Sequence, residues 1–189
     1  RTTGRTPGSA SGTAGQDGQM TDSILGITGA TGRLGGRVAR RLAAVGANQR
    51  LLVRDPSRAP DLAGASAVRA SFDDQPAVEA ALAGVSTVLM VSASETPDRV
   101  DQHRAFIDAT ARAGVGHVVY ISFYGAAPDC TFTLGRDHYA TEQHLRASGM
   151  AFTFLRDNLY SDFLPALAGP DGVIRGPAGD GRVAAVAQD

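Results

Sequence analysis

The feature that most constrains this chain is a glycine-rich turn between a short apolar run and a helical pattern. Residues 23–28 form the apolar run, and Gly29, Gly32 and Gly35 follow it at intervals of three. Gly29 allows a tight turn, Gly32 lets the backbone approach a pyrophosphate, and Gly35 lets the next helix lie close to the strand. This order of strand, turn and helix directs free backbone N–H groups at a phosphate. A glycine-rich turn without a ligand is the alternative.

Short β-rich runs alternate with helical patterns along the rest of the chain. The alternation predicts an α/β fold, a Rossmann-like doubly wound parallel sheet with helices on its faces. Boundary signals agree with it: Asp74 is placed to cap the second helix, Pro76 lies in its first turn, and Gly149 follows the last helix. Strands are expected at 23–28, 50–53, 67–70, 86–91, 117–121 and 151–155, and helices at 34–45, 75–83, 97–113 and 137–148.

Composition narrows the class of protein and its setting. The length of 189 residues suits one domain. The net charge is −1, so the chain has no electrostatic preference for nucleic acid or for an acidic membrane, and we expect neither partner. The single cysteine, Cys130, excludes an intrachain disulfide and argues against a cysteine-based zinc site, which fits a reducing cytoplasm. No apolar run approaches the length of a membrane span. We therefore expect a cytoplasmic protein without a metal site.

The two ends of the chain differ from its middle. Residues 1–20 contain almost no large apolar side chains, so we expect a disordered leader or tag there, with a natural start at Met20. Residues 21–155 form the predicted nucleotide-binding domain. Beyond it the pattern weakens, and we interpret 156–189 as the beginning of an incomplete C-terminal substrate lobe. This part is expected to hold a short helix over 158–167 and a short strand over 182–187.

The residues after the second predicted strand indicate which dinucleotide is preferred. An acidic residue at this point binds the ribose hydroxyls of NAD, but here Arg54 follows the strand and Asp55 comes one place later. An arginine suits the additional 2′-phosphate of NADP, and Arg33 can approach the same phosphate from the glycine turn. We therefore favour NADP(H) over NAD(H). The alternative is that Arg54, Asp55 and Arg58 form a solvated loop.

The segments after the third and fourth predicted strands also contain candidate cofactor residues. Phe72 and Asp73 follow the third strand, where a polar group can reach the adenine amine, and Ser92 follows the fourth, on the side of the nicotinamide ribose. Open α/β sheets bind ligands beyond the carboxyl ends of their strands. The position of these two segments therefore favours contact with the cofactor. The alternative is that both are ordinary loops.

Five motifs occur along the chain in a characteristic order: Thr28-Gly29-Ala30-Thr31-Gly32-Arg33-Leu34-Gly35, Leu52-Val53-Arg54-Asp55-Pro56, His117-Val118-Val119-Tyr120-Ile121-Ser122, His138-x-x-x-Glu142-x-x-Leu145-x-x-Ser148-Gly149 and 152–160. Together they resemble the NmrA-like atypical short-chain dehydrogenases, and within that group the NAD(P)H:quinone oxidoreductases. The resemblance covers about residues 23–189 and implies an oxidoreductase that binds NADPH. The cofactor contacts that the resemblance implies are Gly29, Thr31, Gly32, Arg33, Leu34 and Arg54, with Phe72, Asp73 and Ser92 around the rest of the cofactor.

The chain departs from this group in its proton-transfer residues. Ordinary short-chain dehydrogenases use Tyr-x-x-x-Lys, in which the lysine lowers the tyrosine pKa, but this chain contains no lysine. His138 stands where many relatives carry lysine, so it is a candidate acid or substrate-orienting group, with Tyr124 as a second catalytic candidate. The alternative for His138 is a polar residue at the start of a helix. Family members also continue beyond the residue that corresponds to Asp189.

A quinone acceptor explains how the chemistry runs without the tyrosine–lysine pair. Hydride transfer to a quinone leaves a phenolate-like oxygen, which needs little help from a proton donor, so positioning of the two partners suffices. Phe123, Tyr124 and Tyr160 are expected as aromatic walls for a planar ring, with a packing residue as the alternative for Phe123. Asn158 is expected to orient a carbonyl or to cap the next helix.

Two functions follow from these features. The first is an NADPH-dependent reductase of quinones or similar small electrophiles. A homodimer is consistent with this function. The alternative is a non-catalytic NADP(H)-sensing redox regulator, since such a protein shares the glycine turn and tolerates the loss of the catalytic pair.

Overall fold

A six-stranded parallel sheet forms the centre of the computed structural model, which describes residues 23–175, 180–182 and 184–188. The strand order is β3-β2-β1-β4-β5-β6, so the direction in which strands are added to the sheet reverses between β1 and β4. This order confirms the predicted doubly wound fold, in which ligands bind where the direction reverses. The strands are β1 (Ile24–Thr28), β2 (Gln49–Val53), β3 (Ala65–Arg69), β4 (Val85–Met90), β5 (His117–Phe123) and β6 (Ala151–Asp157).

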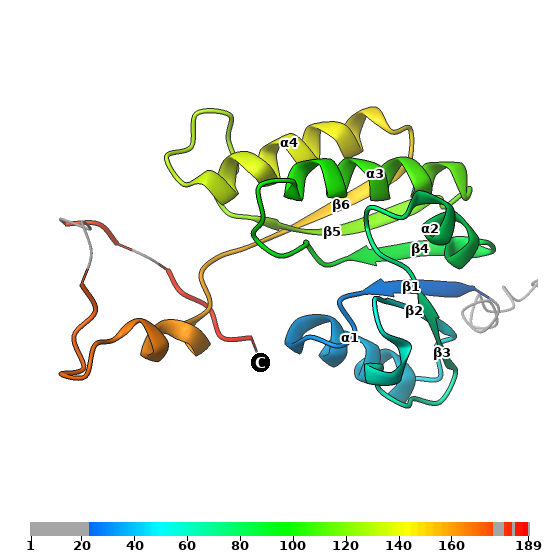
Figure 1. Ribbon diagram of the computed structural model, residues 1–189, viewed down its shortest axis with the longest axis horizontal. Helices are drawn as coiled ribbons and strands as arrows, with labels where there is room; N and C mark the ends of the chain where they lie inside the picture. The colour runs from blue at the N-terminus through cyan, green and yellow to red at the C-terminus, as the bar shows by residue number, and fades with distance from the viewer. Residues whose placement is uncertain (1–22, 176–179, 183, 189) are drawn as a thin grey trace, which may run out of the picture.

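Helices cover both faces of this sheet. Figure 1 shows α2, α3 and α4 on one side, and α1 packs on the opposite side against β1 and β2. Right-handed crossovers from β1 in two directions require this division. The helices are α1 (Arg33–Ala44), α2 (Gln75–Leu82), α3 (Arg99–Arg112) and α4 (Thr133–Ala147), with short 3₁₀ helices η1 (Pro56–Arg58) and η2 (Ser161–Leu167).

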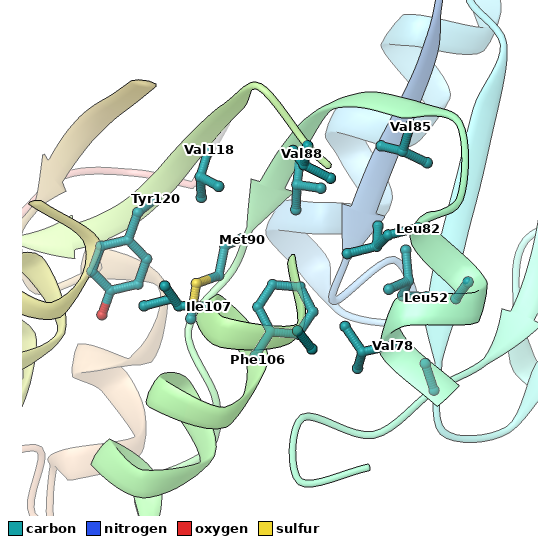
Figure 2. Close-up of a cluster of buried hydrophobic side chains, with 14 of the residues drawn as sticks. Leu52, Val78, Leu82, Val85, Val88, Met90, Phe106, Ile107, Val118 and Tyr120 are labelled. Carbon is teal, nitrogen blue, oxygen red and sulfur yellow. The ribbon is translucent and has the colours of Figure 1, made fainter. Parts of the chain in front are cut away.

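The larger apolar core lies between the sheet and α2, α3 and α4. Figure 2 shows Val88 and Met90 of β4 and Tyr120 of β5 beside Phe106 and Ile107 of α3. All five side chains are almost completely buried. Burial of each contributes about 1.5–3 kcal/mol, so this face of the sheet fixes β4 and β5, whose ends carry the site.

The helix boundaries agree with the sequence except at two starts. Asp74 caps α2, since its carboxylate accepts a hydrogen bond from the Ala77 N–H at 3.2 Å. The helix expected from residue 97 begins at Arg99. The helix expected from 137 begins four residues earlier, at Thr133. Its first turn packs on the preceding loop, because a Cβ on Gly135 would lie 2.6 Å from the Cys130 sulfur.

The chain beyond β6 is held by a few local contacts. The expected short helix is η2, which contains Pro165. Of the strand expected at 182–187, the described residues form a single bridge, between Val186 and Tyr160. The substrate lobe expected over 156–189 stays a prediction, and the leader expected over 1–20 lies outside the described residues. Within the described residues, no helix has both the length and the apolar character that crossing a membrane requires.

Candidate cofactor and substrate site

The glycine turn has the conformation that its sequence predicts. Gly29 has a φ of +66°, which an L side chain rarely adopts. A Cβ on Gly35 would lie 2.4 Å from the Gly29 carbonyl oxygen, so α1 can approach β1 only without a side chain there. At Gly32 a Cβ would meet its nearest atom at 3.3 Å. Packing within the chain therefore explains Gly29 and Gly35 better than Gly32.

The N-terminus of α1 is open to an anion. Gly32 occupies the cap position, no side chain caps the helix, and its first turn contains no acidic residue. α2 differs, because Asp74 already accepts a bond from its first turn. Unpaired N–H groups and the helix dipole together favour a phosphate at the start of α1.

A cavity of about 750 Å³ lies over this turn, at the carboxyl ends of β1, β2, β3 and β4. Its size is within the usual range for small-molecule sites. The structure brings together in its lining every residue that the sequence predicts for the cofactor: Gly29, Thr31, Gly32, Arg33, Leu34, Gly35, Arg54, Phe72, Asp73 and Ser92.

The acidic residue after β2 is turned away from this cavity, whereas the arginine faces it. Arg54 is part of the lining and Asp55 is not. The Asp55 carboxylate accepts hydrogen bonds from the Ser57 hydroxyl at 2.8 Å and the Ser57 N–H at 3.1 Å. These two bonds hold the pKa of Asp55 below its ordinary value. Arg33 lines the cavity from the turn. The charged side chains that line the cavity from the end of β2 and from the turn are therefore cationic.

The residues after β3 are ordered by contacts with their neighbours. The Phe72 ring stacks on Phe106 of α3 at a centroid distance of 4.4 Å, so it contributes to the core as well as to the cavity. The Ser71 hydroxyl donates a hydrogen bond to the Asp73 carboxylate. Ser71 and Asp73 thus form one polar group at this end of the cavity.

Two buried residues of α3 hold the loop after β4. The Ala93 N–H donates to Nε2 of His103 at 2.9 Å, and Nε of Arg99 donates to the Ala93 carbonyl at 3.0 Å. Arg99 and His103 are 3% and 0% exposed. Since Nε2 accepts, Nδ1 of His103 carries the proton, and it lies 2.9 Å from the Thr141 hydroxyl of α4. Burial, with Arg99 and His138 nearby, lowers the pKa of His103 to about 3, so the imidazole is neutral.

Sequence reasoning missed both of these anchoring residues. Arg99 and His103 are one helical turn apart, and they lie on the same face of α3 as the core residues Phe106 and Ile107. The sequence did contain a signal, because both residues fall at helical spacing on an otherwise apolar face. Polar groups that are buried on such a face form hydrogen bonds, so this pattern indicates an anchoring role.

A second cavity, of about 1210 Å³, adjoins the first at the ends of β5 and β6. All three residues predicted to contact the substrate, Phe123, Asn158 and Tyr160, line it, as does Tyr124. Asn158 does not cap η2, since its side chain accepts from the neighbouring Leu159 N–H at 2.8 Å and η2 starts at Ser161. The two cavities share Leu34, Ile121, Asp157, Tyr160 and Gln188 in their linings.

His138 lies behind this second cavity and lines neither of the two. Its Nδ1 is 2.7 Å from the Tyr120 hydroxyl, its Nε2 is 3.1 Å from Arg99, and its ring stacks on Phe123. Burial and the Arg99 charge lower its pKa to about 3. The imidazole is also buried, and α4 begins at Thr133, five residues before His138. His138 is therefore not a polar residue at the start of a helix, which was the alternative interpretation. The geometry does not support His138 as an acid in contact with substrate.

A buried carboxylate connects α4 to the ends of β5 and β6. Glu142 accepts hydrogen bonds from the Arg156 guanidinium at 2.6 and 2.9 Å and from the Ser122 hydroxyl at 2.6 Å. Burial raises the pKa of Glu142, but the hydrogen bonds from Arg156 and Ser122 outweigh it and leave the pKa below its ordinary value. Arg156, which lines the second cavity, is therefore already paired.

The chain matches the family model described as NAD(P)H-binding over residues 29–175. It is 39% identical over 168 residues to quinone oxidoreductase 2 of Escherichia coli, covering 85% of this chain and 58% of that protein. It is 33% identical over 162 residues to the NAD(P)H azoreductase of Xenophilus azovorans, covering 83% and 56%. The chain thus spans less than two thirds of the length of these relatives.

A solved structure supports the same relationship. The NADPH-dependent quinone oxidoreductase QOR2 from Escherichia coli, in complex with NADPH, superposes with a TM-score of 0.78 at 35% identity. The match covers 87% of this chain and 60% of that one.

Proposed function

The chain belongs to the NAD(P)H-binding family of NmrA-like proteins, and from this premise we propose that it is an NADPH-dependent oxidoreductase that transfers hydride to a quinone or a similar small electrophile. One observation carries the proposal. The residues that the glycine turn and the strand ends predict for the cofactor all line one cavity, and an aromatic second cavity adjoins it. The names of the quinone oxidoreductase and azoreductase relatives agree with this assignment.

The first cavity fits NADP(H). The open N-terminus of α1 offers backbone N–H groups to a pyrophosphate, and Gly32 leaves room beside them. Arg54 and Arg33 are the cationic residues of the lining, and they suit a 2′-phosphate. Asp55, which would oppose that phosphate, is bound to Ser57 instead. These contacts support NADP(H) over NAD(H).

The second cavity fits a flat acceptor. Phe123, Tyr124 and Tyr160 supply aromatic surface, and Asn158 supplies a polar group that can orient a carbonyl. When bound, NADPH supplies the hydride. The protein's part is to hold the acceptor where the two cavities meet and to keep water from the reacting atoms.

Turnover separates this proposal from the non-catalytic alternative. The chain, mixed with NADPH and a panel of benzoquinones, should consume NADPH at a steady rate that depends on quinone concentration, measured by absorbance at the nicotinamide band. Tight NADPH binding without turnover of any quinone or azo acceptor would instead support an NADP(H)-sensing regulator. Absence of binding would contradict both functions.

A further inference from the structure

Asp157 and Tyr160 are the two titratable residues, within the described part of the chain, that line both cavities. Asp157 is the last residue of β6, and Tyr160 precedes η2. The other shared lining residues, Leu34, Ile121 and Gln188, carry no titratable group. Among the described residues, these two are the titratable side chains placed where the two cavities meet.

The backbone holds both residues in place. The Asp157 carbonyl accepts from the Tyr124 N–H at 2.7 Å, and Asp157 pairs with Phe123 in the sheet register. Beyond Tyr160, the Ser161 N–H donates to the Val186 carbonyl at 3.0 Å. With main-chain atoms fixing their positions, the two side chains bond to each other: the Tyr160 hydroxyl donates to Oδ2 of Asp157.

The pKa of the Asp157 carboxyl lies above its ordinary value. Burial raises its pKa, and the hydrogen bonds from Tyr160 and from its own backbone only partly oppose this rise. No ion pair with an arginine forms at Asp157 within the described residues. The nearby guanidiniums of Arg156 and Arg33 are close to other carboxylates, at 2.6 Å from Glu142 and 3.8 Å from Asp162. The remaining titratable groups that line the two cavities are Arg54, Asp73, Tyr124 and Arg182.

We propose that Asp157 and Tyr160 form a relay that delivers a proton to the reduced acceptor, an inference that rests on the proposed function. The acceptor carbonyl gains a hydride, with its two electrons, from NADPH, which leaves as NADP⁺. For delivery the Tyr160 O–H turns from Asp157 to the anionic oxygen and gives up its proton, while the protonated carboxyl of Asp157 donates its own proton to the Tyr160 oxygen. Asp157 then regains a proton from solvent. The relay takes the place of the tyrosine–lysine pair, which a chain without lysine does not have.

This role makes the rate depend on how basic the acceptor oxygen becomes. A hydroquinone of low pKa forms a stable anion and needs little proton delivery, whereas a product of high pKa needs much more. The relay therefore contributes most to the rate for acceptors whose reduced oxygen is strongly basic. It also predicts that the rate falls as pH rises through the raised pKa of Asp157, because the carboxyl then loses its proton.

The test compares Asp157→Asn and Tyr160→Phe with matched controls, Asp171→Asn and Tyr139→Phe. Asp171 is exposed and paired with Arg175, and Tyr139 lines neither cavity. Rates are measured over benzoquinones whose hydroquinones differ in acidity. Both relay variants should match wild type for the most acidic products and lose about tenfold to a hundredfold for the least acidic, and Asp157→Asn should also lose the pH-dependent fall. The controls should retain wild-type rates.

A second readout does not depend on turnover. Carbon-13 NMR of the aspartate carboxyls in the chain without added nucleotide should show one group that titrates above the ordinary aspartate range, and Asp157→Asn should remove that signal. An Asp157 carboxyl that titrates at or below the ordinary value would overturn the inference. So would a wild-type chain that turns over while both relay variants keep its rates for every quinone. A wild type that binds NADPH but oxidises none would instead contradict the proposed function.

Discussion

Gly35 illustrates how a single missing side chain shapes the site. Its Cα lies so close to β1 that an added Cβ would be 2.7 Å from the Thr28 carbonyl and 2.4 Å from that of Gly29. Both atoms belong to the backbone, which cannot rotate away as a long side chain can. The close approach brings the open end of α1 to the edge of the cavity.

Gly35→Ala should therefore lower the free energy of unfolding by about 2–3 kcal/mol, because the helix must move away from β1. Gly116→Ala is the matched control, since its Cβ would lie 3.7 Å from the Ser86 carbonyl at an ordinary φ. It should be neutral or stabilising by a few tenths of a kcal/mol, through the reduced entropy of the unfolded chain. Urea denaturation measures both, and equal stabilities for the two variants would contradict the packing argument.

The residues predicted for the cofactor lie in the turn and first helical turn after β1 and in the short segments after β2, β3 and β4, and they line one cavity. At those places the fold itself brings polar groups to one edge, so local pattern is sufficient. Asp157 is the last residue of a strand, but its significance depends on the meeting of two cavities, which only the folded chain reveals. The burial of His138 was missed for a related reason, since the helix that carries it begins four residues earlier than its sequence suggested.

At the scale of elements, α3 both packs in the core and anchors the loop after β4, which lines the site. Phe106 and Ile107 bury its C-terminal half against the sheet, and Arg99 and His103 bury its N-terminal half against the loop at Ala93. Any displacement of α3 would therefore move the residues after β4. The anchor requires a neutral His103, because Nε2 must accept a hydrogen bond.

Stability should accordingly fall in acid. In the folded chain the pKa values of His103 and His138 are near 3, below the ordinary value of 6.5. The unfolded chain binds protons first as pH decreases through 6.5, so the stabilisation that is complete above that value is lost progressively towards pH 3. Each histidine should lower the free energy of unfolding by about 2 kcal/mol between pH 7 and 5.

Urea denaturation at a series of pH values measures this slope. His103→Gln keeps an acceptor for the Ala93 N–H but removes the titration, so its slope should be shallower, and shallower again when combined with His138→Gln. Slopes that are identical for wild type and the double variant would show that the imidazoles are not buried in neutral form.

For the whole molecule, a parallel sheet with helices on its faces follows from the alternation of short strands and helices, and the structure has the predicted doubly wound sheet. The part after β6 was harder to predict. Its main contact joins Tyr160 to Val186 by a single bridge between segments distant in sequence, and neither segment has a periodic pattern that indicates its partner. Long-range contacts of this kind leave no local signal in the sequence. The contribution of Val186 to the lining of the second cavity is therefore seen only in the structure.

The proposed function depends on the binding of a dinucleotide by the turn at Gly29–Gly35, with the 2′-phosphate in contact with Arg54. Isothermal titration calorimetry with NADPH and NADH tests it most directly, on wild type, Arg54→Gln and the control Arg58→Gln, since Arg58 does not line the cavity. Wild type and the control should bind NADPH more tightly than NADH. Arg54→Gln should weaken NADPH binding by about 10- to 100-fold, the loss of a charge-assisted bond, and leave NADH unchanged. Equal affinity of wild type and Arg54→Gln for NADPH, or no binding heat with either nucleotide, would contradict the account.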